Sequence, residues 1–299
     1  MPFKKVIKGL LLFLLVTNSA CDKDITLDLL PPDIRPVVFG VAQAGKPIDL
    51  IVYKSYPLLE YTDTLDQNIL TDISLFVNGN FQEVLTYRNN HYYSNYLPKA
   101  QDNLKISFNW QSIEISAESI IPNKIKIDSV LFVKKTFDNQ RVFNVYFADD
   151  IRFKNYYAIT VDYNYIEYTE NKTAYLTTTS SSPLIGNEED MSDYYDYQSL
   201  LFSDALFNGI SLTLNINIYA PYLNEDETFV DVKLYLSNIT EDYYNYVKTF
   251  LKNQRAQNPS FFFGDLEYIN VHSNIKNGYG LFKTFSLDSV DISQPLRNK

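Results

Sequence analysis

Ile210-Ser-Leu-Thr-Leu-Asn-Ile-Asn-Ile218 alternates apolar and polar residues without a break. A period of two is typical of a β-strand with one buried side and one solvent-facing side. Residues 104–108 and 230–236 repeat the pattern. The chain also contains 25 Tyr and 20 Phe but only nine Gly, and Tyr and Phe favour the pleated, half-buried surface of a sheet. The sequence therefore predicts a mainly β protein.

Turn signals divide the strands into two expected domains. Asn78-Gly79 lies between two apolar runs, which is a strong hairpin signal. Short strands recur over residues 37–122, for which we predict a small β-sandwich of immunoglobulin-like or transthyretin-like type. Residues 123–299 form the second predicted domain, which is β-rich and sandwich-like. It begins with an expected hairpin of residues 125–134 and 142–147.

One helix is expected in the second domain, over about residues 241–254. Thr240 is a good N-cap, and Pro259 prevents the helix from continuing. The apolar positions fall on a single stripe, which we expect to pack on the second sheet rather than to bind a partner. These positions are Tyr243, Tyr246, Val247, Phe250 and Leu251.

Residues 1–20 have the three parts of a secretory signal peptide. Three lysines precede the apolar run 9–16, which is too short to span a bilayer as a helix. Cys21, the single cysteine, follows directly and resembles the cysteine of a bacterial lipobox. The resemblance implies lipid on Cys21, attachment to a membrane through the acyl chains, and a tether over residues 21–36. An ordinary signal peptide with a free cysteine is the alternative.

The residues after this cysteine bear on localisation. Asp22, Lys23 and Asp24 are similar to the signal that exports Bacteroidota lipoproteins to the outer face of the outer membrane. We therefore expect a lipid-anchored outer-membrane protein displayed on the cell surface. Without residues 1–20, which carry three lysines and no acids, the formal charge falls from −10 to −13. This acidity argues against nucleic acid as a partner.

Four segments of the second half resemble a known family when taken together in their order. With Cys21 and the early strand, they resemble the Bacteroidota lipoproteins grouped as domain-of-unknown-function family 4249. The resemblance implies a β-sandwich amino-terminal domain and a β-rich carboxy-terminal domain. Members often occur beside TonB-dependent outer-membrane receptors, and no catalytic residues carry over. The early strand is 37–41, and the four later segments are 155–161, 202–209, 230–246 and 273–282.

No catalytic, cofactor or metal site is expected. His91 and His272, the two histidines, lack a neighbouring Cys or a second His at ligand spacing, and no Gly-x-Ser-x-Gly elbow is present. The acidic segment 188–196 suggests calcium binding, but a solvated loop is favoured because the spacing is not that of an EF-hand.

Two sets of surface residues are candidates for contact or modification. Tyr194, Tyr195 and Tyr197 form a possible partner-contact surface, with packing inside the protein as the alternative. Three tripeptides that begin with Asp are similar to the Bacteroidota O-glycosylation sequon. They make Thr64, Ser129 and Ser289 candidate acceptors.

These features favour a non-enzymatic surface lipoprotein. The leading hypothesis is an accessory partner of a TonB-dependent transporter that helps to capture a nutrient. The alternative is a freestanding adhesin or glycan-binding module. A receptor gene next to this one would favour the first hypothesis, and a polysaccharide-degrading cluster would favour the second.

Overall fold

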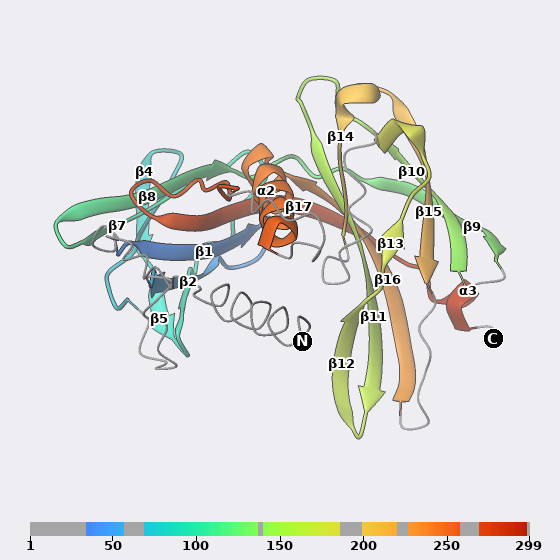
Figure 1. The fold of residues 1–299 in the computed structure, drawn as a ribbon, viewed down its shortest axis with the longest axis horizontal. Coiled ribbons are helices and arrows are strands. Elements are labelled where there is room, and N and C mark those ends of the chain that lie inside the picture. Colours follow the sequence, from blue (N-terminus) through green and yellow to red (C-terminus); the bar gives the residue numbers. More distant parts are fainter. Residues whose placement is uncertain are drawn as a thin grey trace, which may run out of the picture.

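The computed structural model describes residues 34–56, 69–136, 140–185, 199–219, 227–257 and 269–297. Within these ranges the protein is mainly β, as expected (Figure 1). Several predictions fall on residues outside the described ranges and stay predictions. They concern Cys21, Asp22, Lys23, Asp24, Thr64, Tyr194, Tyr195, Tyr197 and the acidic segment 188–196.

A nine-stranded sheet runs through the whole molecule (Figure 1). Its strand order is β12-β11-β16-β17-β1-β2-β6-β5, and β14 also pairs with β11. The parallel pairing of β1 with β17 joins the amino-terminal and carboxy-terminal parts of the chain. The strands are β1 (Pro36–Gln43), β2 (Asp49–Lys54), β5 (Thr86–Arg88), β6 (His91–Tyr93), β11 (Tyr156–Glu167), β12 (Glu170–Tyr175), β14 (Leu200–Ser203), β16 (Glu227–Ile239) and β17 (Tyr279–Asp291).

Two four-stranded sheets pack on the large sheet and enclose two cores. The first core lies against β1 and β2 and the second against β11 and β16. The side chains of Phe282 and Val290, which lie on one face of β17, pack in the first and second core respectively. Both small sheets therefore cover the same face. They are β4 (Asn80–Val84), β3 (Ser74–Val77), β7 (Asn103–Trp110) and β8 (Ile113–Ile120), and β13 (Thr178–Thr179), β15 (Ser211–Tyr219), β10 (Gln140–Ala148) and β9 (Ile127–Lys135).

The last strand, β17, links the two cores. Between Phe282 and Val290, the buried hydroxyls of Thr284 and Ser286 donate to the carbonyl oxygens of Ile120 and Pro122, at 2.8 and 2.6 Å. The first core thus includes a side chain far beyond residues 37–122, and the expected boundary after Pro122 does not divide the large sheet. Residues 279–291 were not expected to form a strand, so the sequence did not predict this crossing.

The expected hairpins form. Asn78 and Gly79 both have positive φ, 51° and 78°, in the turn between β3 and β4, as a type I′ turn requires. β9 pairs with β10, and residues 137–139 of their connection lie outside the described ranges. In β15, the apolar residues of the alternating stretch are buried in the second core.

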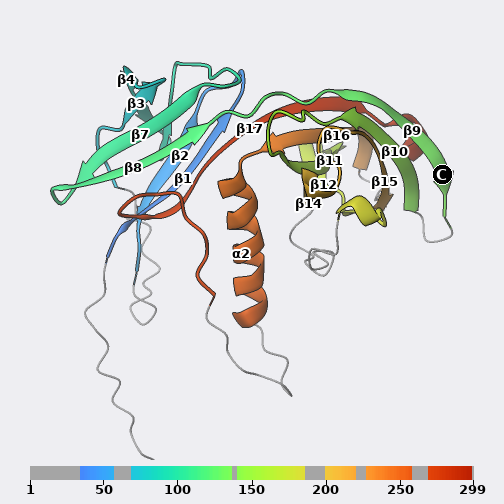
Figure 2. The same ribbon diagram turned by 90° about the horizontal axis from the view of Figure 1, so that it is seen from above.

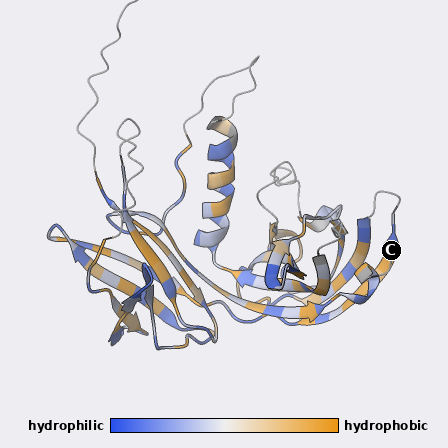
Figure 3. Ribbon diagram, turned by 90° about the horizontal axis from the view of Figure 1, so that it is seen from below, coloured by the Kyte–Doolittle hydropathy of each residue, from blue (hydrophilic) through white to orange (hydrophobic). Residues whose placement is uncertain are grey.

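Helix α2 (Glu241–Gln257) begins where expected and is three residues longer than predicted. Most of the predicted stripe packs: Val247 and Leu251 are buried, and Tyr243 and Tyr246 are partly buried against them. Two positions differ, because Tyr244 is also buried and Phe250 is 37% exposed. The reason is that α2 projects from the concave side of the strand arch (Figure 2), so that only a narrow strip meets β11, β14 and β17. Hydrophilic and hydrophobic residues therefore both appear along α2 (Figure 3).

The remaining helical elements are short. They are η1 (Pro183–Ile185), η3 (Asp204–Leu206) and α3 (Gln294–Arg297). In the part of the chain that the structure describes, no helix has the length and apolar character needed to cross a membrane.

Candidate functional site

A cleft of about 440 Å³ lies on the concave face of the large sheet, beside α2. Strands β11, β16 and β17 contribute residues to it, α2 contributes Tyr243, and the turn after β1 contributes Lys46. The cleft lies on the face opposite both cores, because alternate residues of β11 and β16 point into the second core. It is the candidate binding site.

Neighbouring strands set the order of the side chains that line this cleft. Ala158 pairs with Ser237, and Thr160 pairs with Tyr235. Asp162 follows two residues later on the same face of β11. The lining thus changes from small and apolar near α2 to hydroxyl-bearing and acidic further along the strands.

Asp162 is the acidic side chain among the described residues that line the cleft. Burial raises the pKa of its carboxyl, and the positive charge of Lys233 opposes this rise only in part. Burial also raises the pKa of the Tyr235 phenol, and the nearby charge of Asp162 raises it further. Since a partly buried carboxylate gains from additional hydrogen-bond donors, a ligand that supplies such donors would be stabilised here.

Aromatic rings surround the carboxylate and the hydroxyl groups. Tyr175, on β12, lines the cleft and is 57% exposed. Tyr243 and Phe285 line it near α2, with their ring centroids 6.4 Å apart. Lys283 lies over the Tyr243 ring, 5.1 Å from its centroid. The cleft therefore combines apolar ring surface with hydroxyl groups, as small-molecule sites commonly do.

The first turn of α2 is fixed by a charged contact with the strand below it. The Tyr156 hydroxyl donates to the carboxylate of Glu241, and Lys154 Nζ lies 3.1 Å from the same carboxylate. These contacts lower the pKa of Glu241, with the Tyr156 hydrogen bond as the largest cause. A negative charge in the first helical turn is also favoured by the helix dipole.

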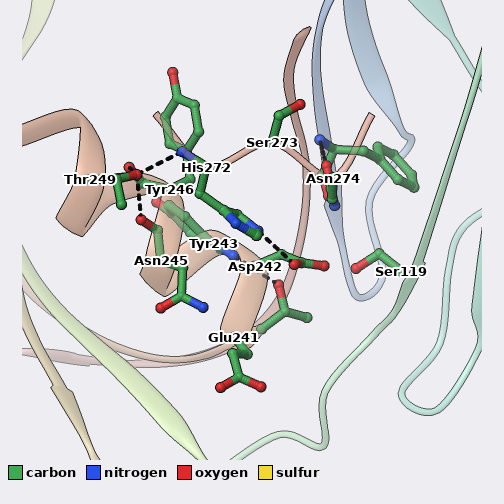
Figure 4. A network of polar contacts seen from close by, with 12 residues as sticks. Ser119, Glu241, Asp242, Tyr243, Asn245, Tyr246, Thr249, His272, Ser273 and Asn274 are labelled. Carbon is green, nitrogen blue, oxygen red and sulfur yellow. Dashed lines mark hydrogen bonds and ion pairs between the residues drawn. The ribbon is translucent and has the colours of Figure 1, made fainter. Parts of the chain in front are cut away.

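The segment after residue 268 is held along the side of α2 (Figure 4). The backbone N–H of His272 donates to Thr249 Oγ1 at 2.8 Å, and His272 Nε2 lies 2.8 Å from Asp242 Oδ1. Asn253 Nδ2 donates to the carbonyl oxygen of Ile269 at 2.6 Å. The hydroxyl of Ser119, also drawn in Figure 4, exchanges a hydrogen bond with Thr284 Oγ1 at 2.7 Å. The contacts of His272 with Thr249 and Asp242 thus hold this segment against the helix, and they form the clamp on α2.

The second histidine also has an acidic partner that sequence reasoning missed. His91 Nδ1 lies 2.7 Å from Asp49 Oδ1, and its ring stacks on Tyr93. His91 and Asp49 are 42 positions apart, and His272 and Asp242 are 30 positions apart. No local sequence motif could therefore predict either pair. Within the described ranges, no three His, Cys, Asp or Glu side chains gather where they could hold a metal ion.

Comparison with protein families gives one match. The model of a domain of unknown function (DUF4249) matches residues 23–289. The chain belongs to this family. This confirms the resemblance carried by the ordered segments of the second half, and the family description states no function.

No curated protein matches the chain significantly. Among solved structures, it is similar to a DUF4785 family protein from Legionella pneumophila, with a TM-score of 0.21, 11% identity, and coverage of 68% of this chain and 51% of that one. It is also similar to a β-glucuronidase from Bacteroides uniformis, with a TM-score of 0.20, 11% identity, and coverage of 69% and 30%. The chain spans about half and about a third of these proteins, and the scores are too low to support an argument about function.

The family segments around residues 155 and 202–209 meet in a buried polar cluster. Asp149 accepts hydrogen bonds from the Tyr157 hydroxyl and from Gly209 N–H, the latter at 2.6 Å. The Asp204 carboxylate accepts the backbone N–H of Asn155, 49 positions away. The two residues meet because the chain entering β11 lies beside η3. These residues fix the loops at one end of the second core and do not line the cleft.

Two of the candidate glycosylation residues lie in the described ranges. Ser129 on β9 and Ser289 on β17 are both exposed. Their modification stays a prediction.

Proposed function

We propose that this protein is a lipid-anchored outer-membrane lipoprotein that assists a TonB-dependent transporter by holding a nutrient in the cleft beside α2. The signal-like residues 1–20 and Cys21 support the anchor. The resemblance to the family supports the transporter as partner, because it implies that members occur beside TonB-dependent receptors. The observation that carries the binding role is the cleft itself, where a partly buried carboxylate, hydroxyl groups and aromatic rings face a cavity of about 440 Å³.

The lining favours binding without turnover. Acid–base cleavage of a glycosidic bond uses two carboxyl groups, and activation of a serine nucleophile uses an adjacent base. Among the described lining residues, Asp162 is the single acid and no histidine is present. Neither the carboxylate pair of a glycosidase nor a serine–histidine pair is therefore present among these described residues.

The test is co-purification of the native full-length protein from detergent-solubilised membranes. We expect a TonB-dependent receptor to be recovered in a stoichiometric amount, identified by mass spectrometry. The variant Cys21→Ala should leave the membrane fraction, since its anchor is lost. An unrelated lipoprotein of the same cells, purified in parallel, controls for non-specific capture. Repeated recovery without any receptor would refute the proposed partnership.

Exposure on the cell is tested separately. Proteinase added to intact cells should cut the wild-type protein. Neutralising Asp22 and Asp24 should protect it if these residues direct surface export. Protection of the wild-type protein on intact cells would place it on the periplasmic side and contradict surface display.

A further inference from the structure

We infer that the cleft beside α2 binds a neutral saccharide, with the Asp162 carboxylate accepting hydrogen bonds from its hydroxyl groups. This inference rests on the proposed capture role and names the class of ligand for the same site. It follows from the hydrogen-bonding groups of the lining, from its charge and from its ring surfaces.

The lining is rich in hydroxyl groups. Thr160, Ser199, Ser237 and Tyr235 all contribute side chains to it. Each hydroxyl both donates and accepts, which matches a ligand whose own polar groups are hydroxyls. The Tyr235 hydroxyl already pairs with the Asp162 carboxylate. A purely apolar ligand would bury the hydroxyls of Thr160, Ser199 and Ser237 without giving them a partner, at a cost of about 1–3 kcal/mol for each unsatisfied group. The lining therefore selects a polar ligand with many hydroxyl groups.

The charges of the site disfavour ligands of either sign. Asp162 would repel a phosphate or a carboxylate, and the net charge of −10 for the whole chain adds to this repulsion. Lys46 at the cleft and Lys233 beside Asp162 oppose a cationic ligand. Lys233 does not neutralise Asp162 fully, since its Nζ also lies 3.3 Å from the Asp231 carboxylate. A neutral ligand that donates hydrogen bonds to Asp162 avoids both kinds of repulsion.

The rings and the apolar strip supply the remaining contact surface. A saccharide ring has C–H faces that pack on aromatic faces, and Tyr175 and Tyr243 offer such faces at two sides of the cleft. Ala158 and Leu287 provide an apolar strip between them. The cavity of about 440 Å³ lies within the range of small-ligand sites, about 300–1,000 Å³. It therefore suits a short oligosaccharide or the end of a longer chain.

The test is isothermal titration calorimetry on the full-length protein in detergent. The neutral probes are maltohexaose, laminarihexaose, xylohexaose and mannohexaose, and the charged and peptide probes are hexagalacturonate and tetra-alanine. We expect at least one neutral probe to bind and both other probes to fail. Replacing Asp162→Asn should weaken that binding about ten-fold or more, because a hydrogen bond to a charged acceptor is lost. Tyr235→Phe should weaken it less, and Asp128→Asn, on the exposed start of β9, should leave it unchanged.

The outcomes separate this inference from the proposed function. Failure of all four neutral probes, or binding that Asp162→Asn leaves unchanged, would overturn the saccharide assignment. Binding of tetra-alanine or hexagalacturonate alone, lost in Asp162→Asn, would also overturn it but would leave the capture role standing. Co-purification of the receptor with Asp162→Asn reports on the partnership independently of the ligand. Thermal unfolding of Asp162→Asn in parallel identifies any loss of folding.

Discussion

The carboxylate of Asp204 accepts the backbone N–H of Asn155 at 2.6 Å, and the backbone N–H of Asp204 donates to the carbonyl oxygen of Asn155 at 3.1 Å. This reciprocal pair joins the start of β11 to η3. The Asn155 side chain also donates to Asp149 at 3.1 Å and accepts from Asn238 at 3.1 Å. One asparagine thereby ties two loops to the central strands β11 and β16.

This relationship predicts a large difference between two changes at one position. Asp204→Ala leaves the buried Asn155 N–H without its side-chain acceptor, and we expect the free energy of unfolding to fall by about 1–3 kcal/mol. Asp204→Asn keeps an oxygen acceptor and should cost less. Urea denaturation followed by circular dichroism measures both. Equal losses in the two variants would show that the acceptor oxygen does not explain the effect.

The partly buried carboxyl of Asp162 predicts a dependence of stability on pH. Since the pKa of Asp162 is raised in the folded protein, the folded state binds this proton more tightly than the unfolded state. Its contribution to stability therefore decreases as the pH rises above the ordinary value of 3.8. Asp162→Asn should be more stable than the wild type at pH 7, with a difference that shrinks toward pH 3. Thermal unfolding over this range tests the sign, and a less stable variant at pH 7 would contradict it.

The contact between β1 and β17 predicts a position that accepts only glycine. At Gly280, where φ is +104°, an added Cβ would lie 2.1 Å from the carbonyl oxygen of Val38. Gly280→Ala should lower the free energy of unfolding by more than about 3 kcal/mol. Gly45→Ala is the control, because its φ is +78° but nothing lies within 4 Å; it should cost only about 1–2 kcal/mol. Chemical denaturation compares them, and similar losses would contradict the close approach.

The buried face of α2 predicts different effects at two of its positions. Leu251 is 3% exposed, and Leu251→Ala should cost about 2–5 kcal/mol through the cavity it leaves. The buried Tyr244 hydroxyl has no hydrogen-bond partner among the described residues, so Tyr244→Phe should be neutral or slightly stabilising. Differential scanning calorimetry checks both. A marked loss in Tyr244→Phe would reveal an unrecognised partner of that hydroxyl.

The clamp on α2 predicts a local change in hydrogen exchange. Thr249→Val removes the acceptor of the His272 N–H, so the exchange of this amide should accelerate. Thr249→Ser keeps the hydroxyl and should leave the exchange close to that of the wild type. Mass spectrometry of peptides covering residues 269–275 follows the difference. Unchanged exchange in Thr249→Val would mean that other contacts hold the segment.

Local patterns determined much of the fold. The alternation in residues 210–218 gives a strand, because a residue period of two places the apolar side chains on one face whatever lies opposite. Asn78-Gly79 gives a hairpin because both residues adopt positive φ readily. Thr240 starts α2, with its Oγ1 3.4 Å from the Tyr243 backbone nitrogen.

Only the tertiary structure decided how these elements combine. β17 is hard to predict as a strand because Thr284 and Ser286 occupy its buried face. Their hydroxyls are satisfied by groups distant in the sequence, the carbonyl oxygens of residues 120 and 122 and, for Thr284, also the Ser119 hydroxyl. The cleft places Lys46 and Asp162 on one surface although they are far apart in the chain. Sequence periodicity specifies which face of an element is apolar, but the contacts between distant elements depend on strand order and register. For this protein, those contacts place the candidate site.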